Sequence, residues 1–178
     1  MNFSFQTALP ILARTPSVLD QLLRNLPAVW VESTEGPDTW SPYDVIGHLI
    51  HGDRTDWVPR VEHILAHGET VTFPPFDRFA QFEASRGKSL TDLLDTFRDL
   101  RAGCLNRLES LGLTDADLTR TGRHPEFGRV TLGQHLATWV AHDLDYIMQI
   151  VRVMAWQYGD AVGPWRRYLR IVDPERAG

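Results

Sequence analysis

Histidines with helical spacing are the residues in this sequence most able to do chemistry. His48 and His51 lie one turn apart in the stretch GHLIHGD. His135, His142 and Tyr146 lie further along the chain, in a second stretch whose polar and aromatic residues also recur every three or four positions. Such spacing places side chains on one stripe of a helix. Imidazole is a ligand for zinc, nickel, copper or iron, so facing stripes of histidine indicate a metal site.

A catalytic metal site usually has three protein ligands and keeps one position open. His48 and His142 supply two of these ligands. Helical spacing alone does not identify the third ligand; the candidates are Tyr146, His135, His51 or a nearby acid. A phenol has a pKa near 10 and must lose its proton to bind a metal well.

The alternative is that these histidines are surface or hydrogen-bonded core residues, which is the commoner situation for a histidine on a helix. We assign three to that group: His63, His67 and His124. Asp143 and Asp145 follow His142 closely and could orient its ring. They could equally belong to a solvated face, which we expect for Asp145.

Composition limits the classes of protein to consider. The chain has 178 residues, the length of one domain, so we expect a single domain over residues 1–178. A net charge of −5 and scattered basic residues argue against nucleic acid as a partner. No run of about 18 apolar residues predicts a membrane span, and the first residues do not resemble a signal peptide. The single cysteine, Cys104, excludes an intrachain disulfide, so we expect a cytoplasmic protein.

Four amphipathic segments must position the candidate residues. Pro16 should kink or break the first, leaving a helix from Ser17 to Leu26. The other three helices are expected over residues 42–67, 89–111 and 132–158, each preceded or opened by a capping residue. We expect the loop within residues 69–87 to cover one end, a short strand pair within residues 113–130, and a final turn near residues 165–171. The pattern predicts an all-α four-helix bundle.

Several short motifs, in order along nearly the whole chain, resemble the DinB-like superfamily. They are WSPYDVIGHL at residues 40–49, Asp56-Trp57 with Arg60, LGQ at residues 132–134, HDLDYIMQI at residues 142–150, and GPWRRYL at residues 163–169. The resemblance implies a four-helix bundle in an up-down-down-up arrangement, often dimeric. The apolar and aromatic residues around Trp156, Tyr158 and Trp165 could supply the homodimer interface.

The resemblance also implies chemistry. Family members commonly hold a divalent metal such as zinc or nickel with three histidines, one from the second helix and a His-x-x-x-His pair from the last long helix. Members of known activity include thiol-dependent transferases that use bacillithiol or mycothiol and a related isomerase. The founding name refers to induction by DNA damage.

Matched by position, His48 corresponds to the second-helix ligand and His142 to the first of the pair, while Tyr146 replaces the second. The sequence therefore predicts a metal-dependent enzyme of the thiol-transferase or hydrolase type, acting on a small molecule such as a low-molecular-weight thiol. His48, His142 and Tyr146 would form its altered metal site, and Tyr146 and Asp143 are its candidate catalytic residues. The alternative is a non-catalytic bundle, without metal, that binds a small molecule or acts as a stress-related interaction protein.

Overall fold

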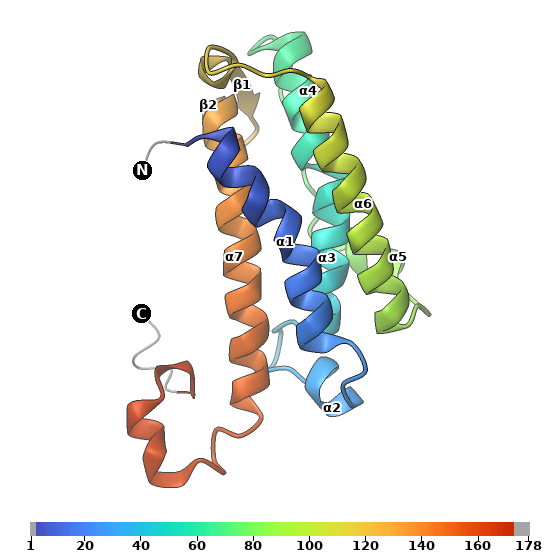
Figure 1. Ribbon diagram of the computed structural model, residues 1–178, viewed down its shortest axis with the longest axis vertical. Helices are drawn as coiled ribbons and strands as arrows, with labels where there is room; N and C mark the ends of the chain where they lie inside the picture. Colours follow the sequence, from blue (N-terminus) through green and yellow to red (C-terminus); the bar gives the residue numbers. More distant parts are fainter. Residues whose placement is uncertain (1–2, 173–178) are drawn as a thin grey trace.

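Four long helical segments form a bundle in the computed structural model, which describes residues 3–172 (Figure 1). They are α1 (Phe5–Leu23), α3 (Pro42–Thr55) continued by α4 (Trp57–His67), α6 (Leu90–Ser110) and α7 (Leu132–Trp156). Segments α1 and α7 run in one direction, and α3–α4 and α6 run in the other. The predicted all-α four-helix bundle with up-down-down-up order is therefore confirmed. No helix in residues 3–172 is long and apolar enough to cross a membrane.

Short elements connect the long helices. The short helix α2 (Ala28–Val31) follows α1, and α5 (Ala80–Ser85) packs against α3 within the crossover between α4 and α6. After α6 come a 3-10 turn η1 (Asp117–Thr119) and an antiparallel hairpin of β1 (Thr121–His124) and β2 (Gly128–Thr131), as the sequence predicted. Two further 3-10 turns, η2 (Gly163–Tyr168) and η3 (Arg170–Val172), follow α7.

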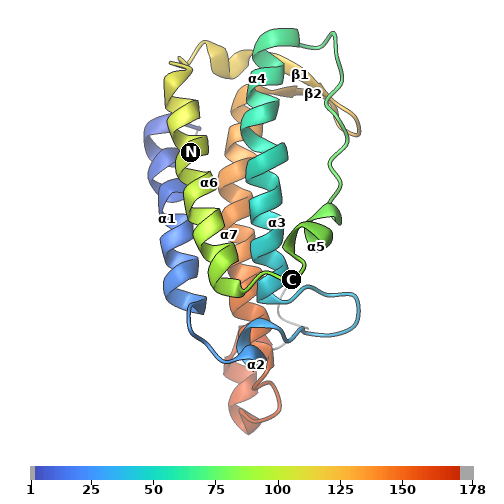
Figure 2. The same cartoon turned by 90° about the vertical axis from the view of Figure 1, so that its right-hand side faces the viewer.

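The crossover from α4 to α6 was expected to cover one end of the bundle. It instead returns along the side of the bundle to α5 (Figure 2). Near its start it is tied to the hairpin, because the Phe73 backbone N–H donates to the Arg123 carbonyl oxygen at 2.9 Å. The crossover therefore forms a wall beside α3, where it can contribute residues to a site.

Capping boxes fix the starts of three of the long helices. In each box the cap hydroxyl accepts from the backbone N–H three residues on, and that residue's side chain accepts from the cap N–H. The pairs are Ser41 with Asp44, Ser89 with Asp92, and Thr131 with Gln134. These caps were readable from the sequence, and they set where α3 and α7 begin and hence which residues face each other.

The expected break at Pro16 was wrong, because α1 is continuous through it. A proline inside a helix leaves the carbonyl four residues earlier without its usual donor. Here that carbonyl belongs to Leu12, and it accepts a hydrogen bond of 3.0 Å from Nη1 of Arg101 on α6. A distant side chain therefore satisfies the group that Pro16 leaves unpaired.

The single helix expected over residues 42–67 is in fact two helices that meet at Asp56. Pro59 explains the interruption, since it has no N–H to donate to the Thr55 carbonyl and its ring would clash there. Asp56 has φ −115° and ψ −64°, a φ about 50° away from the typical α-helical value. Trp57 then packs back on α3, where a Cβ at Gly52 would lie 3.0 Å from the Trp57 indole nitrogen.

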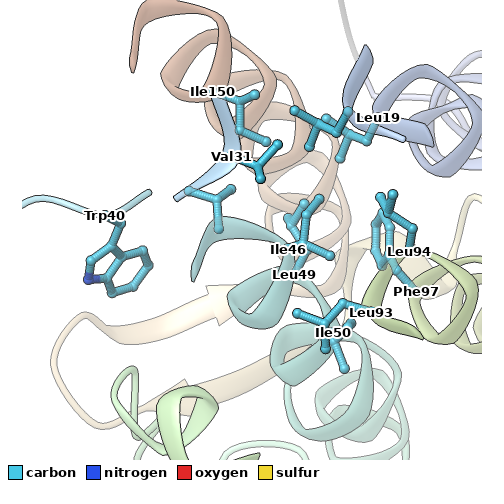
Figure 3. Close-up of a cluster of buried hydrophobic side chains, with 12 residues drawn as sticks. Leu19, Val31, Trp40, Ile46, Leu49, Ile50, Leu93, Leu94, Phe97 and Ile150 are labelled. Carbon is cyan, nitrogen blue, oxygen red and sulfur yellow. The ribbon is translucent and has the colours of Figure 1, made fainter. Parts of the chain in front are cut away.

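Two apolar clusters fill the bundle and a charged layer separates them. The first cluster joins α1, α3, α6 and α7 through residues such as Leu19, Ile46, Phe97 and Ile150 (Figure 3). The second lies toward the hairpin, and there the rings of Trp57 and Trp139 stack with centroids 5.7 Å apart. Between the two clusters lie three fully buried charged side chains: Asp53, Arg101 and Asp143.

Candidate metal site and adjoining cavity

His48 and His142 meet across α3 and α7. Their Nε2 atoms are 3.2 Å apart, and the ring centroids are 5.3 Å apart. Two imidazole nitrogens that bind one tetrahedral zinc ion, each at 2.0–2.1 Å, lie about 3.3 Å apart. The observed separation is close to that value, and it is also that of a hydrogen bond in which the Nε2–H of one ring donates to the Nε2 of the other.

Tyr146 adjoins this pair as the predicted third member. It lies one turn after His142 on α7, and its ring centroid is 4.7 Å from that of His48 and 4.5 Å from that of His142. Burial raises the pKa of the Tyr146 hydroxyl above its ordinary value, and the nearby Arg78 charge only partly opposes this effect. Near neutral pH the side chain is a phenol, which can donate a proton and must ionise to become a strong ligand.

Burial also keeps both histidines neutral. It lowers the pKa of His48 to about 3, with smaller contributions from His142, His51 and Arg78. It lowers the pKa of His142 to about 4, with a smaller contribution from Arg101. Neutral imidazole is the form that binds metals.

The second ring nitrogen of each histidine, Nδ1, makes no hydrogen bond within residues 3–172. Nδ1 of His48 and Nδ1 of His142 are both buried. A histidine that binds a metal usually donates its second ring N–H to a carboxylate or carbonyl. The two rings are therefore held by packing and by the contact between their Nε2 atoms, without the hydrogen bonds at Nδ1 that normally strengthen a metal site.

The other candidate ligands lie elsewhere. His135 is buried against Trp57, with Nε2 2.9 Å from the Trp57 carbonyl oxygen. The ring of His51 packs on Phe76 with centroids 4.9 Å apart. Within residues 3–172, no group of three or more His, Cys, Asp or Glu side chains is arranged to hold a metal. Of the four candidates for the third ligand, the structure places Tyr146 beside the pair.

Asp143 contacts Arg101, and the orienting contact with His142 that the sequence allowed is not formed. Its carboxylate oxygens accept from Nη1 and Nη2 of Arg101, the latter at 3.1 Å. Asp53 accepts from the same guanidinium at 2.8 and 3.0 Å. Burial, opposed by Arg101, raises the pKa of Asp53 to about 6. Asp145 is exposed, as expected.

Arg101 is the residue that sequence reasoning missed. It links α3, α6, α7 and, through Leu12, α1. The sequence does contain an indication of its role, because Arg101 falls four residues after Phe97 on the apolar stripe of α6. An arginine on a core-facing stripe implies a buried partner. Asp53 lies five residues after His48 on α3, and Asp143 directly follows His142 on α7. The contacts of both with Arg101 therefore fix the positions of α3 and α7, and with them the positions of the two imidazole rings.

A cavity of about 490 Å³ opens in front of the histidine pair. It is lined by His48, His142 and Tyr146 and by the aromatic side chains of Trp57 and Phe76. Residues from α4, the crossover and the hairpin also line it: Arg60, which is buried, His124, and the exposed side chains of Arg78, Glu126 and Phe127. The size is that of pockets that hold small organic molecules.

The order and direction of the helices define a four-helix bundle, and comparisons with known proteins agree on this fold. The DinB superfamily model matches residues 11–150, so the chain belongs to the DinB superfamily. Among solved structures it resembles YfiT from Bacillus subtilis, with a TM-score of 0.73 and 21% identity over 86% of this chain and 87% of that one. YfiT is described as a probable metal-dependent hydrolase with an unusual four-helix bundle topology. At that identity the likeness concerns the fold. A search of curated proteins found no match.

Proposed function

We propose that this DinB-superfamily protein is a metal-dependent enzyme of the hydrolase or thiol-transferase type. The observation that carries the proposal is the 3.2 Å separation of the Nε2 atoms of two neutral histidines that line a cavity. The description of YfiT as a probable metal-dependent hydrolase supports the hydrolase form. The thiol-transferase form rests on the family resemblance.

His48 and His142 would hold the metal, and Tyr146 would be either a weak third ligand or a proton donor. A divalent zinc or nickel ion at this point would act as a Lewis acid that lowers the pKa of a water or thiol. The raised pKa of Tyr146 favours the proton-donor role, because a phenol that keeps its proton can give it to a leaving group. The aromatic walls would exclude water from the bound substrate.

Two observations favour a second candidate, a bundle that binds small molecules without catalysis. The site has only two nitrogen ligands, and the Nδ1 atoms of both histidines lack hydrogen-bond partners within residues 3–172. Known catalytic zinc sites have three protein ligands, and their histidines are usually supported by such contacts. In this case the cavity would remain functional and the histidine pair would be a remnant of a metal site.

An activity assay separates the two candidates. The purified full chain would be tested on a chromogenic ester and on a thiol adduct, with and without added zinc or nickel. The proposal expects a rate that rises with metal and is lost in His142→Ala. His67→Ala, which replaces an exposed histidine outside the cavity, should retain that rate. Tyr146→Phe should lower the maximal rate while leaving metal binding in place if Tyr146 is the proton donor. No metal-dependent rate on either substrate would favour the second candidate.

A further inference from the structure

Arg78 holds a positive charge beside the site without a partner for it. It lies on the crossover just before α5, with its guanidinium carbon 5.0 Å from the centroid of Trp40 and 5.4 Å from that of Phe79. Trp40 in turn packs on His48, with centroids 5.0 Å apart, and lies parallel to the ring of Tyr146. The aromatic rings therefore hold Arg78, an exposed side chain, where it lines the cavity together with His48 and Tyr146.

The two arginines of the cavity differ in their contacts. Arg60 pairs with Asp56 at 2.7 Å and also donates to the Pro74 carbonyl oxygen at 3.4 Å. Arg78 has no ion pair or hydrogen bond with any residue from 3 to 172; its contacts there are with aromatic faces. Because these contacts use none of the five guanidinium N–H groups, the donors remain available for a planar oxyanion.

The other charges around the cavity do not neutralise Arg78. Asp56 is already paired with Arg60. His124 has its pKa lowered, by burial first and by the charge of Arg60 second, so it adds no positive charge near neutral pH. Glu126 is exposed at the turn of the hairpin, where solvent screens its charge. An anion that entered the cavity would therefore find Arg78 as its available cation.

The rest of the lining is apolar and aromatic. Trp57, Pro75, Phe76 and Phe127 all line the cavity, and Phe127 is an exposed side chain at the tip of the hairpin. Such walls favour a flat or apolar body and contribute little to holding a charge. Arg78 therefore determines whether a negatively charged group is bound, and the apolar and aromatic lining determines which molecular shape fits.

We propose that the cavity binds a carboxylate-bearing small molecule, with its carboxylate paired to Arg78 and its apolar body against Trp57, Phe76 and Phe127. As a statement about the substrate, this rests on the proposed function. The binding itself needs no metal, because neither Arg78 nor the aromatic walls belong to the histidine pair. Arg78 would then decide which molecules the site accepts.

Calorimetric titration of the metal-free full chain tests the proposal. The probes are 2-naphthoate and 2-naphthamide, which share a ring and differ in charge. Because Arg78 is exposed, an ion pair with it predicts that 2-naphthoate binds about two- to fivefold more tightly. Arg78→Gln should remove this preference and leave 2-naphthamide binding unchanged. Arg86→Gln is the matched control, since Arg86 is exposed, lies nearby, pairs with Glu83 and does not line the cavity.

The outcomes separate this inference from the proposed function. A preference for 2-naphthoate that is lost in Arg78→Gln supports the inference even if no metal ever binds. Equal affinity for the two probes, or equal losses in Arg78→Gln and Arg86→Gln, would overturn it. Failure of both probes to bind at millimolar concentration would overturn it as well, and would leave a measured metal site unaffected.

Discussion

The Nε2 atoms of His48 and His142 lie 3.2 Å apart although 94 residues separate them in the chain. Capping boxes begin α3 and α7 at fixed residues, and Arg101 ties the two helices together through Asp53 and Asp143. The close approach of the two rings therefore follows from the register of the helices. The same register places Tyr146 beside both rings.

Tyr146→His should strengthen metal binding. A third imidazole, one turn after His142, would replace a phenol that burial keeps protonated. We expect zinc or nickel to bind about tenfold or more tightly, since one added nitrogen ligand completes a three-ligand set. Competition with a chromogenic chelator measures the affinity. The control is Tyr158→His, an exposed tyrosine beyond α7; equal gains in both variants would exclude a role for position 146.

Arg101→Met should destabilise the fold by about 3–5 kcal/mol, because it leaves two buried carboxylates without their cation. Asp53→Asn should cost less, since one carboxylate would still pair with Arg101. Urea unfolding followed by circular dichroism measures both. Arg107→Met is the control on the same helix, where an exposed pair with Glu62 is worth about 0–1 kcal/mol. Equal losses in Arg101→Met and Arg107→Met would show that the buried layer does not hold the helices.

His135 should make stability depend on pH. Burial lowers its pKa from 6.5 to about 4, so between these values the unfolded state binds more protons. Above about pH 6.5 His135 is neutral in both the folded and the unfolded state, and the free energy of unfolding is unaffected. As the pH falls toward 4 only the unfolded state binds the proton, and the free energy of unfolding decreases by about 3 kcal/mol in all. The raised pKa of Asp53 acts in the opposite sense between about pH 4 and 6.

Comparison of His135→Gln with the unmodified chain isolates that contribution, because Asp53 is present in both. The free energy of unfolding of the variant, measured in urea from pH 4.5 to 8, should fall less steeply below pH 6.5. Parallel curves for the two proteins would mean that His135 is not held neutral by burial.

Gly47→Ala tests how closely α5 is packed beside the site. A Cβ at Gly47 would lie 2.5 Å from Oγ of Ser85 and 2.6 Å from Oε1 of Gln81, which is fully buried. We expect a loss of about 1–3 kcal/mol, because α5 must shift to accept the methyl group. Gly103→Ala on α6 is the control, since a Cβ there meets nothing within 4 Å. Thermal unfolding of both variants measures the difference.

Local rules predicted most of the fold. The capping residues at 41, 89 and 131 and the helical periodicity after them placed three helix starts, and the hairpin followed from its turn residues. The two errors in the helices both concern proline. Pro16 is tolerated because Arg101 reaches the Leu12 carbonyl, and that contact comes from α6. Pro59 was overlooked beside the strong helical pattern around it.

The site was predictable in part. Spacing and the family resemblance singled out His48, His142 and Tyr146, and the structure brings their rings together. The partner of Asp143 was not predictable, because its contact with Arg101 crosses between helices. The position of Arg78 depends on the path of the crossover, which no periodic pattern encodes.

Metal content of the full chain is the most direct test of the proposed site. Untagged protein would be exposed to zinc or nickel, desalted and measured by elemental analysis, alongside His48→Ala, His142→Ala and His67→Ala. We predict about one metal ion per chain in the unmodified protein and in His67→Ala, and none in the other two variants. No retained metal, or equal metal in His48→Ala, would contradict the metal site.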